Sequence, residues 1–374
     1  MSTARRLAPA SKTQTLCRDL RALAYELGAG EKFPTAIELC ERFQTSRATL
    51  NDALDILEDQ GILSRRRGSG IYVSTRLHTK CIYVLLYAYL FLGENKSPFW
   101  GMFSGLLAEE MERRTLNNAY QCELHFVLQS DRDKLALPQS VVEMIESGRV
   151  DGILTVGMNN ITTAWIEQQG VPCVVYAGYG PYTVTQDLDT LVRQAVTLLA
   201  SKGCQRIGFW TESTYYETER ELSSDRLIEQ SFIQALKEYS LPLYPELIHY
   251  KTMRRATLQG PVPTYQQQGY QYVMEIFGNK NHPQPDGLFI DNDMITSGAL
   301  AAFQRLGIHP GEELCIVTQT NTGSPILFGY EDELSRVEFD PAELVHEMFA
   351  MLDILLQPER PETLHFQILP RNHS

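Results

Sequence analysis

The spacing of apolar residues near the start of the chain predicts short helices. Between Thr15 and Leu27 the apolar side chains recur as on one helical face, at Leu16, Leu20, Leu23, Ala24 and Leu27. The glycines that follow, Gly28 and Gly30, end this helix. The pattern therefore predicts an amphipathic helix with one buried face.

Two more helices and a hairpin are expected before residue 75. Thr35, with Glu38 three residues later, matches a capping box and starts a helix that ends near Phe43. Thr45 and Ser46 offer a cap for a third helix, which Gly61 closes. The segment 62–74 has two β-prone stretches joined by an Arg/Gly turn, which is typical of a hairpin.

After residue 80 apolar strands alternate with helical stretches, which predicts parallel sheets covered on both faces. The expected elements are Ile82–Tyr89, Phe103–Arg114, Glu123–Leu128, Pro138–Ser147, Gly152–Val156, Ile161–Gln168, Cys173–Tyr176, Asp187–Ser201, Arg206–Trp210, Asp225–Tyr239, Gly287–Ile290, Thr296–Leu306 and Cys315–Thr318. This region is too long for one doubly wound domain, so we expect two lobes with a cleft between them.

Composition narrows the class of protein. With 374 residues, 43% hydrophobic and 21% charged, the chain suits a multidomain globular protein. The longest apolar run, Cys81–Leu92, is too short to cross a bilayer and is expected to be a buried strand. The N-terminus lacks the apolar region of a secretory signal. Seven cysteines without CxxC spacing suggest reduced thiols, so we expect a cytoplasmic protein.

The net charge of −13 is unevenly distributed. Residues 1–80 contain 13 Lys/Arg and 9 Asp/Glu, a balance of +4, whereas residues 81–374 contain 20 and 37, a balance of −17. A basic head on an acidic body is typical of a DNA-binding module fused to another domain.

The first module has the order of a winged helix-turn-helix, and its residues resemble the GntR-type DNA-binding domain. The resemblance rests on three segments, Phe33-Pro34-Thr35, Ser46-Arg47-Ala48-Thr49-Leu50 and Gly68-Ser69-Gly70-Ile71-Tyr72-Val73. Family members often have Arg at the positions of Ile37 and Asn51, so the operator sequence does not carry over.

This resemblance implies that the third helix and the wing bind DNA. Hydroxyls in the first turn of that helix can meet phosphates, an arginine there can reach a base edge, and wing cations can touch phosphates or the minor groove. The residues expected at DNA are Thr35, Thr45, Ser46, Arg47, Thr49, Asn51, Arg65, Arg66, Arg67 and Gly68. The alternative is a winged helix that binds another protein.

The second module resembles the LacI/GalR-type effector domain, which is similar to periplasmic sugar-binding proteins. The matching segments, in chain order, are Ser97-Pro98-Phe99-Trp100, Arg149–Leu154, Gly170-Val171-Pro172, Val184 with Asp187, Gly203–Gly208, and Pro285–Gly287 leading to Asp291–Met294 and Gly298–Leu300. The resemblance implies a ligand site between two lobes, at strand ends and helix N-termini.

Carried over residue by residue, this resemblance implies a ligand site with altered polar anchors. Glu229 stands where the family has a sugar-clamping Arg, Thr320 where it has an Asp, and Ala177 where it has an acidic residue. The expected ligand-binding residues are Phe99, Trp100, Arg226, Glu229, Asn292, Asp293, Thr320 and Asn321.

The fold class expected is an α+β winged head plus an α/β two-lobed, periplasmic-binding-protein-like body. We expect a DNA-binding head at 12–74, a hinge linker at 75–80 and an effector-binding and dimerisation domain at 81–374. Within that domain, lobe 1 is expected at 81–186 and 321–335, and lobe 2 at 187–320 and 336–374.

The resemblances together imply a bacterial transcription regulator, expected to be a repressor. It would bind a palindromic DNA operator as a homodimer and respond to a sugar-like small molecule, with no metal, cofactor or membrane partner. One alternative is a body that only dimerises, without a ligand. Another is an enzyme body with pyridoxal phosphate, but Lys202 and Lys237 do not suit a Schiff base, so no enzyme is expected.

Overall fold

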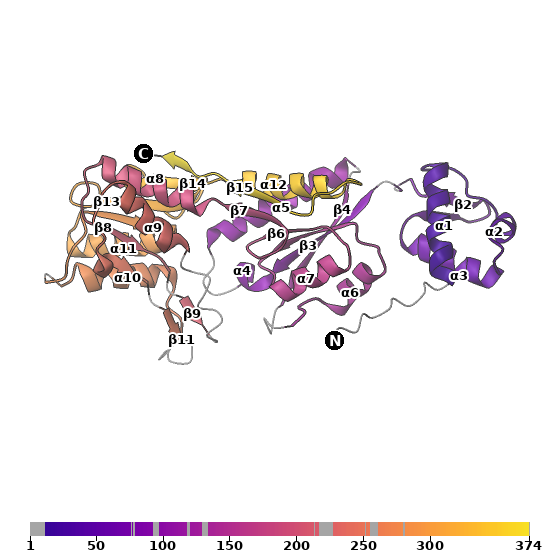
Figure 1. Ribbon diagram of the computed structural model, residues 1–374, viewed down its shortest axis with the longest axis horizontal. Coiled ribbons are helices and arrows are strands. Elements are labelled where there is room, and N and C mark those ends of the chain that lie inside the picture. The colour runs from indigo at the N-terminus through magenta and orange to yellow at the C-terminus, as the bar shows by residue number, and fades with distance from the viewer. Residues whose placement is uncertain are drawn as a thin grey trace. The chain divides into compact units, whose positions relative to one another are not determined.

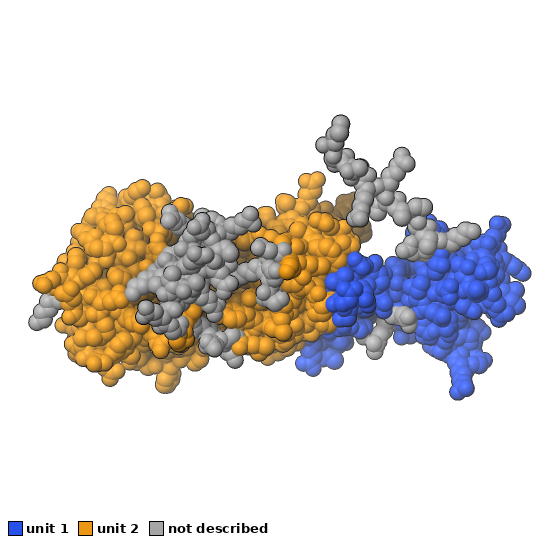
Figure 2. Space-filling model, turned by 90° about the horizontal axis from the view of Figure 1, so that it is seen from below, with its two compact units in different colours: residues 1–83, 111–123, 139–152 blue, residues 84–110, 124–138, 153–374 orange. Residues whose placement is uncertain are grey.

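The computed structural model describes most of the chain: residues 12–75, 77, 79–92, 97–117, 120–128, 134–212, 214–216, 227–250, 252–254, 261–279 and 281–373. The chain divides into two compact units (Figure 2). One contains residues 1–83, 111–123 and 139–152, and the other contains residues 84–110, 124–138 and 153–374.

The N-terminal helices form where the sequence predicts them. They are α1 (Lys12–Leu27), α2 (Ala36–Phe43) and α3 (Arg47–Asp59) (Figure 1). Their apolar stripes meet in one core, in which Leu20, Leu39 and Leu50 are fully buried. Gln44 has a left-handed backbone (φ 47°) that ends α2 and allows the turn into α3.

A small antiparallel hairpin completes this head. It consists of β1 (Leu63–Arg66) and β2 (Gly70–Val73), with Leu63 opposite Val73. The segment before α2 extends it, because Phe33 donates its N–H to the Ile71 carbonyl and Lys32 bridges to Tyr72. The predicted winged helix-turn-helix is therefore confirmed.

The first large sheet has the strand order β15-β7-β6-β5-β3-β4 among the described residues. Its strands are β3 (Lys80–Tyr87), β4 (Tyr120–Val127), β5 (Gly152–Val156), β6 (Cys173–Tyr176), β7 (Tyr182–Gln186) and β15 (Leu364–Ile368). The helices of this part of the chain are α4 (Ala88–Leu92), α5 (Pro98–Leu116), α6 (Gln139–Glu146), α7 (Asn160–Gln168) and α12 (Pro341–Leu355). The pairs β5–β6, β6–β7 and β7–β15 are parallel, and α12 packs on β6, β7 and β15.

The second large sheet has the order β10-β8-β12-β13-β14-β16 in the described part of the chain. Its strands are β8 (Ile207–Trp210), β10 (Ile248–His249), β12 (Gly287–Ile290), β13 (Cys315–Asn321), β14 (Ser335–Phe339) and β16 (Arg371–His373). All neighbours are parallel except β14 and β16. A separate parallel pair joins β9 (Thr214–Tyr216) to β11 (Thr252–Arg254).

Helices cover both faces of the second sheet (Figure 1). On one face lies α8 (Leu188–Ser201), which packs on β12, β13 and β14 and against α9 (Leu227–Glu238). On the other lies α11 (Asp293–Leu306), which packs on β12 and β13 and against α10 (Tyr265–Ile276). A short 3-10 helix spans Pro245–Leu247.

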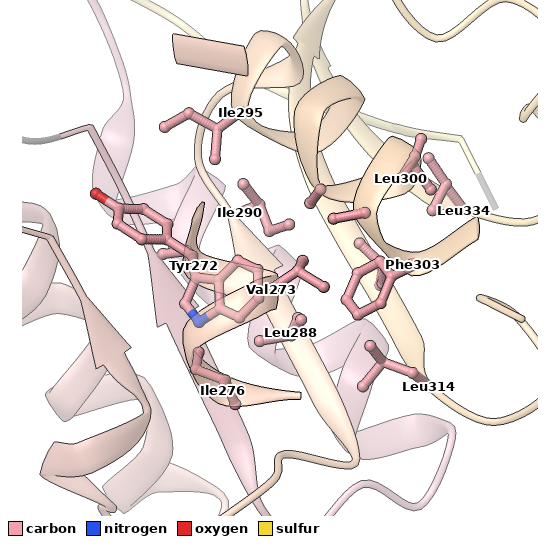
Figure 3. Packing of buried hydrophobic residues seen from close by; sticks show 14 of the residues in the cluster. Tyr272, Val273, Ile276, Leu288, Ile290, Ile295, Leu300, Phe303, Leu314 and Leu334 are labelled. Carbon is pink, nitrogen blue, oxygen red and sulfur yellow. The ribbon is translucent and has the colours of Figure 1, made fainter. Parts of the chain in front are cut away.

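The core beneath α10 and α11 is built from aromatic and branched side chains. Figure 3 shows Tyr272 and Val273 of α10 beside Leu288 and Ile290 of β12, with Phe303 of α11 next to them. The two helices approach so closely that a Cβ added at Gly298 would lie 1.9 Å from the Gln266 carbonyl oxygen. Only a residue without a side chain allows this contact.

Many body elements agree with the sequence-based expectation, and the strands at Gly152–Val156, Cys173–Tyr176 and Gly287–Ile290 agree residue for residue. The apolar run Cys81–Leu92 is not one strand, because the strand ends at Tyr87 and α4 follows. Helix α10 was not predicted, since its glutamines interrupt the apolar stripe. One of them, Gln268, is nevertheless buried and donates to the Pro263 carbonyl.

The predicted assignment of C-terminal segments to lobes was wrong for residues 321–335, for α12 and for β15. Residues 321–335 were expected in lobe 1, but Leu327 and Leu334 pack in the core of the second sheet. Residues 336–374 were expected in lobe 2, and β14 and β16 do lie in the second sheet. However, β15 pairs with β7 in the first sheet, and α12 packs there. The expected linker 75–80 also needs correction, because Leu77 is 5% exposed and packs in the head core, and β3 starts at Lys80.

Candidate functional sites

The first turn of α3 presents polar side chains from a fixed backbone. Ser46 caps the helix, since its Oγ accepts the Thr49 N–H at 3.2 Å and lies 2.9 Å from Thr49 Oγ1. Arg47 and Asn51, one helical turn apart, are exposed. Arg47 forms no ion pair with any described residue, so its guanidinium is available to a phosphate or a base edge.

The start of α2 is held by its capping box. The Thr35 N–H and Oγ1 donate to Glu38 Oε2 at 2.7 and 2.8 Å, and Thr35 Oγ1 accepts the Glu38 N–H. These bonds lower the pKa of Glu38, first through the backbone N–H of Thr35. The Thr35 hydroxyl is therefore already engaged. Thr45, half-buried, donates its N–H to the Cys40 carbonyl in the turn between the helices.

The three wing arginines have different surroundings. Arg65 forms ion pairs with Asp55 and Glu58 of α3, at 2.5 and 3.3 Å. The Arg66 guanidinium carbon lies 4.3 Å from the centre of the Tyr72 ring. Arg67 is exposed at the turn, where Gly68 adopts φ 76°.

In the second sheet, four expected ligand residues lie at the ends of β12 and β13. Asn292 caps α11, since its Oδ1 accepts the Met294 N–H at 2.9 Å, which leaves Nδ2 for a ligand. Asp293 is buried, and its Oδ2 accepts the hydroxyls of Thr320 and Ser324 at 2.8 and 2.7 Å. Burial raises the pKa of Asp293, and these hydroxyls oppose the shift.

Asn321 is a candidate whose side-chain hydrogen bonding is not satisfied by the described residues. It is only 9% exposed, and its Oδ1 has no hydrogen-bond partner within the part of the chain that the structure describes. The loop after it approaches α5, since a Cβ at Gly323 would lie 3.8 Å from Met102 Cε. An unsatisfied buried amide oxygen requires a partner such as a ligand or water.

Phe99 and Trp100 lie in an aromatic group at the start of α5. Their ring centres are 4.9 Å apart, and both face Tyr176 at the end of β6, at 6.4 and 6.2 Å. Phe91 lies 5.2 Å from Trp100 on another side. Phe99 is buried, so it serves this packing, whereas Trp100 is partly exposed.

Glu229 of α9 accepts the Tyr250 hydroxyl at 2.9 Å. Arg226 lies outside the described residues. The structure therefore joins Asp293 to Thr320 directly and places Phe99 beside Trp100. Among the described residues, Glu229 hydrogen-bonds Tyr250 and none of the other expected residues.

Sequence reasoning missed a polar group at neighbouring strand ends. Because Ile290 pairs with Trp210, Asp291 after β12 lies beside Thr211 and Glu212 after β8. Burial raises the pKa of Asp291 to about 8, the Thr211 hydroxyl opposes this, and Glu212 adds to it. Tyr265 of α10 hydrogen-bonds Glu212. The signal was present, since Asp291 directly follows one apolar strand of a parallel sheet and Glu212 is the second residue after another.

Among the described residues, no three His, Cys, Asp or Glu side chains are grouped so that they could hold a metal ion. Nor is any described helix long and apolar enough to span a membrane.

Comparison with known families identifies both parts of the chain. Residues 14–73 match the bacterial regulatory proteins of the gntR family, and residues 196–372 match the periplasmic binding protein-like domain. The chain joins a gntR-type regulatory head to a periplasmic-binding-protein-like body. It is a transcription regulator, and neither matched domain is an enzyme domain.

Solved structures support the fold of the body. A regulatory protein of the LacI family from Chloroflexus aggregans is 20% identical, with a TM-score of 0.59, covering 78% of this chain and 96% of that one. The regulator CcpA of Lactococcus lactis is 17% identical, with a TM-score of 0.56 and coverages of 79% and 98%. The regulator CelR, solved in complex with cellobiose, is 17% identical, with a TM-score of 0.57 and coverages of 88% and 91%. At these identities the likeness shows a shared fold.

Proposed function

We propose that this gntR-type regulator is a cytoplasmic repressor that binds a palindromic operator as a homodimer. A small molecule, a sugar or sugar derivative, binds between the two lobes of the body and changes operator affinity. The observation that supports DNA binding most strongly is Arg47, exposed at the capped N-terminus of α3 without an ion pair to a described residue.

The head suits the major groove. The N-terminal part of a recognition helix meets base edges, and Arg47 lies in its first turn with Asn51 one turn later. A wing cation next to this helix adds contacts to the backbone or minor groove. The other residues expected at DNA support this surface through caps, turns, ion pairs and a ring contact. They are Thr35, Thr45, Ser46, Thr49, Arg65, Arg66 and Gly68.

The edge of the first sheet supports a dimer. Strand β4 is the last strand of that sheet in the described residues, and Phe126 is 47% exposed. Leu128, just after it, is 82% exposed. An edge strand with exposed apolar side chains favours a partner, and a second copy matches the symmetry of a palindromic operator.

Two observations support a ligand in the body. The buried Asn321 Oδ1 lacks a partner among the described residues, and the loop after it approaches Met102 of α5. CelR and a LacI-type regulator from Alkaliphilus metalliredigens were solved with cellobiose and D-xylulofuranose, respectively. A ligand that prefers one lobe arrangement would change the separation of the two heads and so the DNA affinity.

One observation favours the alternative of a body that only dimerises. The polar groups of Asp293 and Thr320 bind each other, and Glu229 binds Tyr250. Side chains already satisfied by the protein contribute less to a ligand.

Genomic immunoprecipitation of the tagged protein tests the DNA-binding proposal. We expect enrichment at a compact palindrome, increased transcription beside it when the gene is deleted, and a dimer in sedimentation analysis. Absence of an enriched site would contradict the proposal, as would a monomer bound to a single half-site.

Thermal shift with sugars, sugar acids and nucleosides tests the ligand. We expect one class to stabilise the wild type and the Asn160→Ala control, which changes an exposed amide of α7, but not the Asn321→Ala variant. A panel without any shift would favour the dimerisation module. A shift that survives in Asn321→Ala would remove Asn321 from the site.

A further inference from the structure

The geometry of the wing assigns different tasks to its three consecutive arginines. Along β1 the side chains alternate between faces, so Arg65 and Arg66 point to opposite sides of the hairpin. Arg67 follows in the turn, where the Ser69 N–H donates to the Arg66 carbonyl at 2.9 Å. Adjacent residues of the same type therefore meet different neighbours.

Arg65 faces the recognition helix. Its Nη2 lies 2.5 Å from Asp55 Oδ1, and its Nη1 lies 3.3 Å from Glu58 Oε2. The backbone N–H of Arg65 also donates to Glu58 Oε1 at 3.1 Å. Three contacts thus join the wing to α3. They also place a cation beside two carboxylates that would otherwise repel DNA phosphates next to that helix.

Arg66 lies on the other face, against the hairpin itself. Ser64 is opposite Tyr72, so Arg66 is the diagonal neighbour of Tyr72, and its guanidinium lies over that ring. The Tyr72 hydroxyl lies 2.7 Å from Ser69 Oγ, on the far side of the turn. This contact stiffens the wing internally.

Arg67 differs from both. It is exposed at the outermost position of the hairpin, and the structure records no ion pair or ring contact for it with any described residue. A long cation at the tip of a stiff wing is the group best placed to reach a phosphate or a narrow minor groove.

We propose that Arg67 is the wing's DNA contact, and that Arg65 is a positioning residue that holds the wing on α3 through Asp55 and Glu58. This inference rests on the proposed DNA-binding function. The sequence alone predicts that all three wing arginines contact DNA. In this proposal only Arg67 contacts DNA, and Arg65 fixes the position of the wing.

Operator affinity measured against salt concentration separates the two tasks. Each phosphate contact adds about 0.9 to the slope of log K against log salt, which corresponds to about eightfold in affinity at 0.1 M salt. We expect Arg67→Ala to lose about eightfold and to lower the slope by about 1. Arg65→Ala should lose affinity with an unchanged slope. A slope lowered by about 1 in Arg65→Ala, or unchanged in Arg67→Ala, would overturn the assignment.

Removing the anchor's partner gives a test of opposite sign. If Arg65 positions the wing, Glu58→Ala should weaken operator binding although it removes a negative charge from the head. If Arg65 instead contacts phosphate, the same change frees it and should strengthen binding. Glu41→Ala, an exposed carboxylate on α2, is the control and should not weaken binding.

Hydrogen exchange in the DNA-free protein tests the anchor independently of the proposed function. Arg65→Ala and Glu58→Ala should speed the exchange of amides in β1 and β2, while Arg67→Ala should leave it unchanged. Equal exchange in all variants would refute the anchor even if the operator is bound. Faster exchange together with no operator binding by the wild type would instead contradict the DNA-binding function.

Discussion

The head and the body of this regulator use polar side chains differently. On the head, Arg47 and Arg67 are exposed and engage no described residue through an ion pair, so they are available to DNA. In the body, Asp293 is buried and bonded to Thr320 and Ser324, and Asn292 caps a helix. The head therefore exposes side chains that can bind DNA without first breaking bonds within the protein. The expected pocket residues of the body, in contrast, also form hydrogen bonds that stabilise their own lobe.

This difference predicts that body variants act mainly on stability, whereas head variants act on DNA affinity. The largest effect should come from Gly298→Ala. The new Cβ would lie 1.9 Å from the Gln266 carbonyl, so α10 and α11 must separate, at a cost of at least about 2 kcal/mol. Urea unfolding followed by tryptophan fluorescence measures it.

Gly105→Ala is the matched control, because nothing lies within 4 Å of a Cβ on this glycine of α5. It should be neutral, or stabilise by about 0.5–1 kcal/mol as alanine does in a helix. Equal unfolding midpoints for the two variants would refute the tight contact between α10 and α11.

A smaller effect is expected from Thr320→Val. It removes one of the two hydroxyls that donate to the buried Asp293 carboxylate, which should cost about 1–3 kcal/mol. The same urea experiment, with and without a stabilising ligand, shows whether the variant loses folding stability, ligand binding or both. If stability is unchanged and only ligand binding is lost, then Asp293 belongs to the pocket rather than to the lobe.

Asp291 predicts a pH dependence. Burial holds its pKa at about 8 in the folded protein, against about 3.9 in the unfolded chain. The folded state therefore binds more protons between these values, and its stability falls as pH rises from about 4 to about 8.

Asp291→Asn removes this dependence. Relative to the wild type, the variant should gain stability as pH rises from 5 to 8, by at most about 1.4 kcal/mol per pH unit. Asp332→Asn, which changes an exposed carboxylate, is the control and should give a constant difference. A constant difference for Asp291→Asn as well would show that this carboxyl group is ionised throughout.

The same contrast explains what could be predicted from the sequence. The caps at Thr35 and Ser46 were predictable because each bond joins residues three apart. The lobe assignment failed because β15 pairs with β7. Leu364 and Tyr182 are neighbours in the sheet, although most of the body's sequence separates them. The bond from Thr320 to Asp293 and the ion pairs of Arg65 likewise depend on register between elements, which spacing along the chain does not reveal.

Operator affinity of Arg47→Ala is the most direct test of the central claim. Fluorescence anisotropy should show a loss of about 1–3 kcal/mol on the operator and a much smaller loss on unrelated DNA, while Arg18→Ala, on exposed α1 surface, binds as the wild type does. Unchanged operator affinity in Arg47→Ala, or equal loss on both DNAs, would contradict recognition by α3.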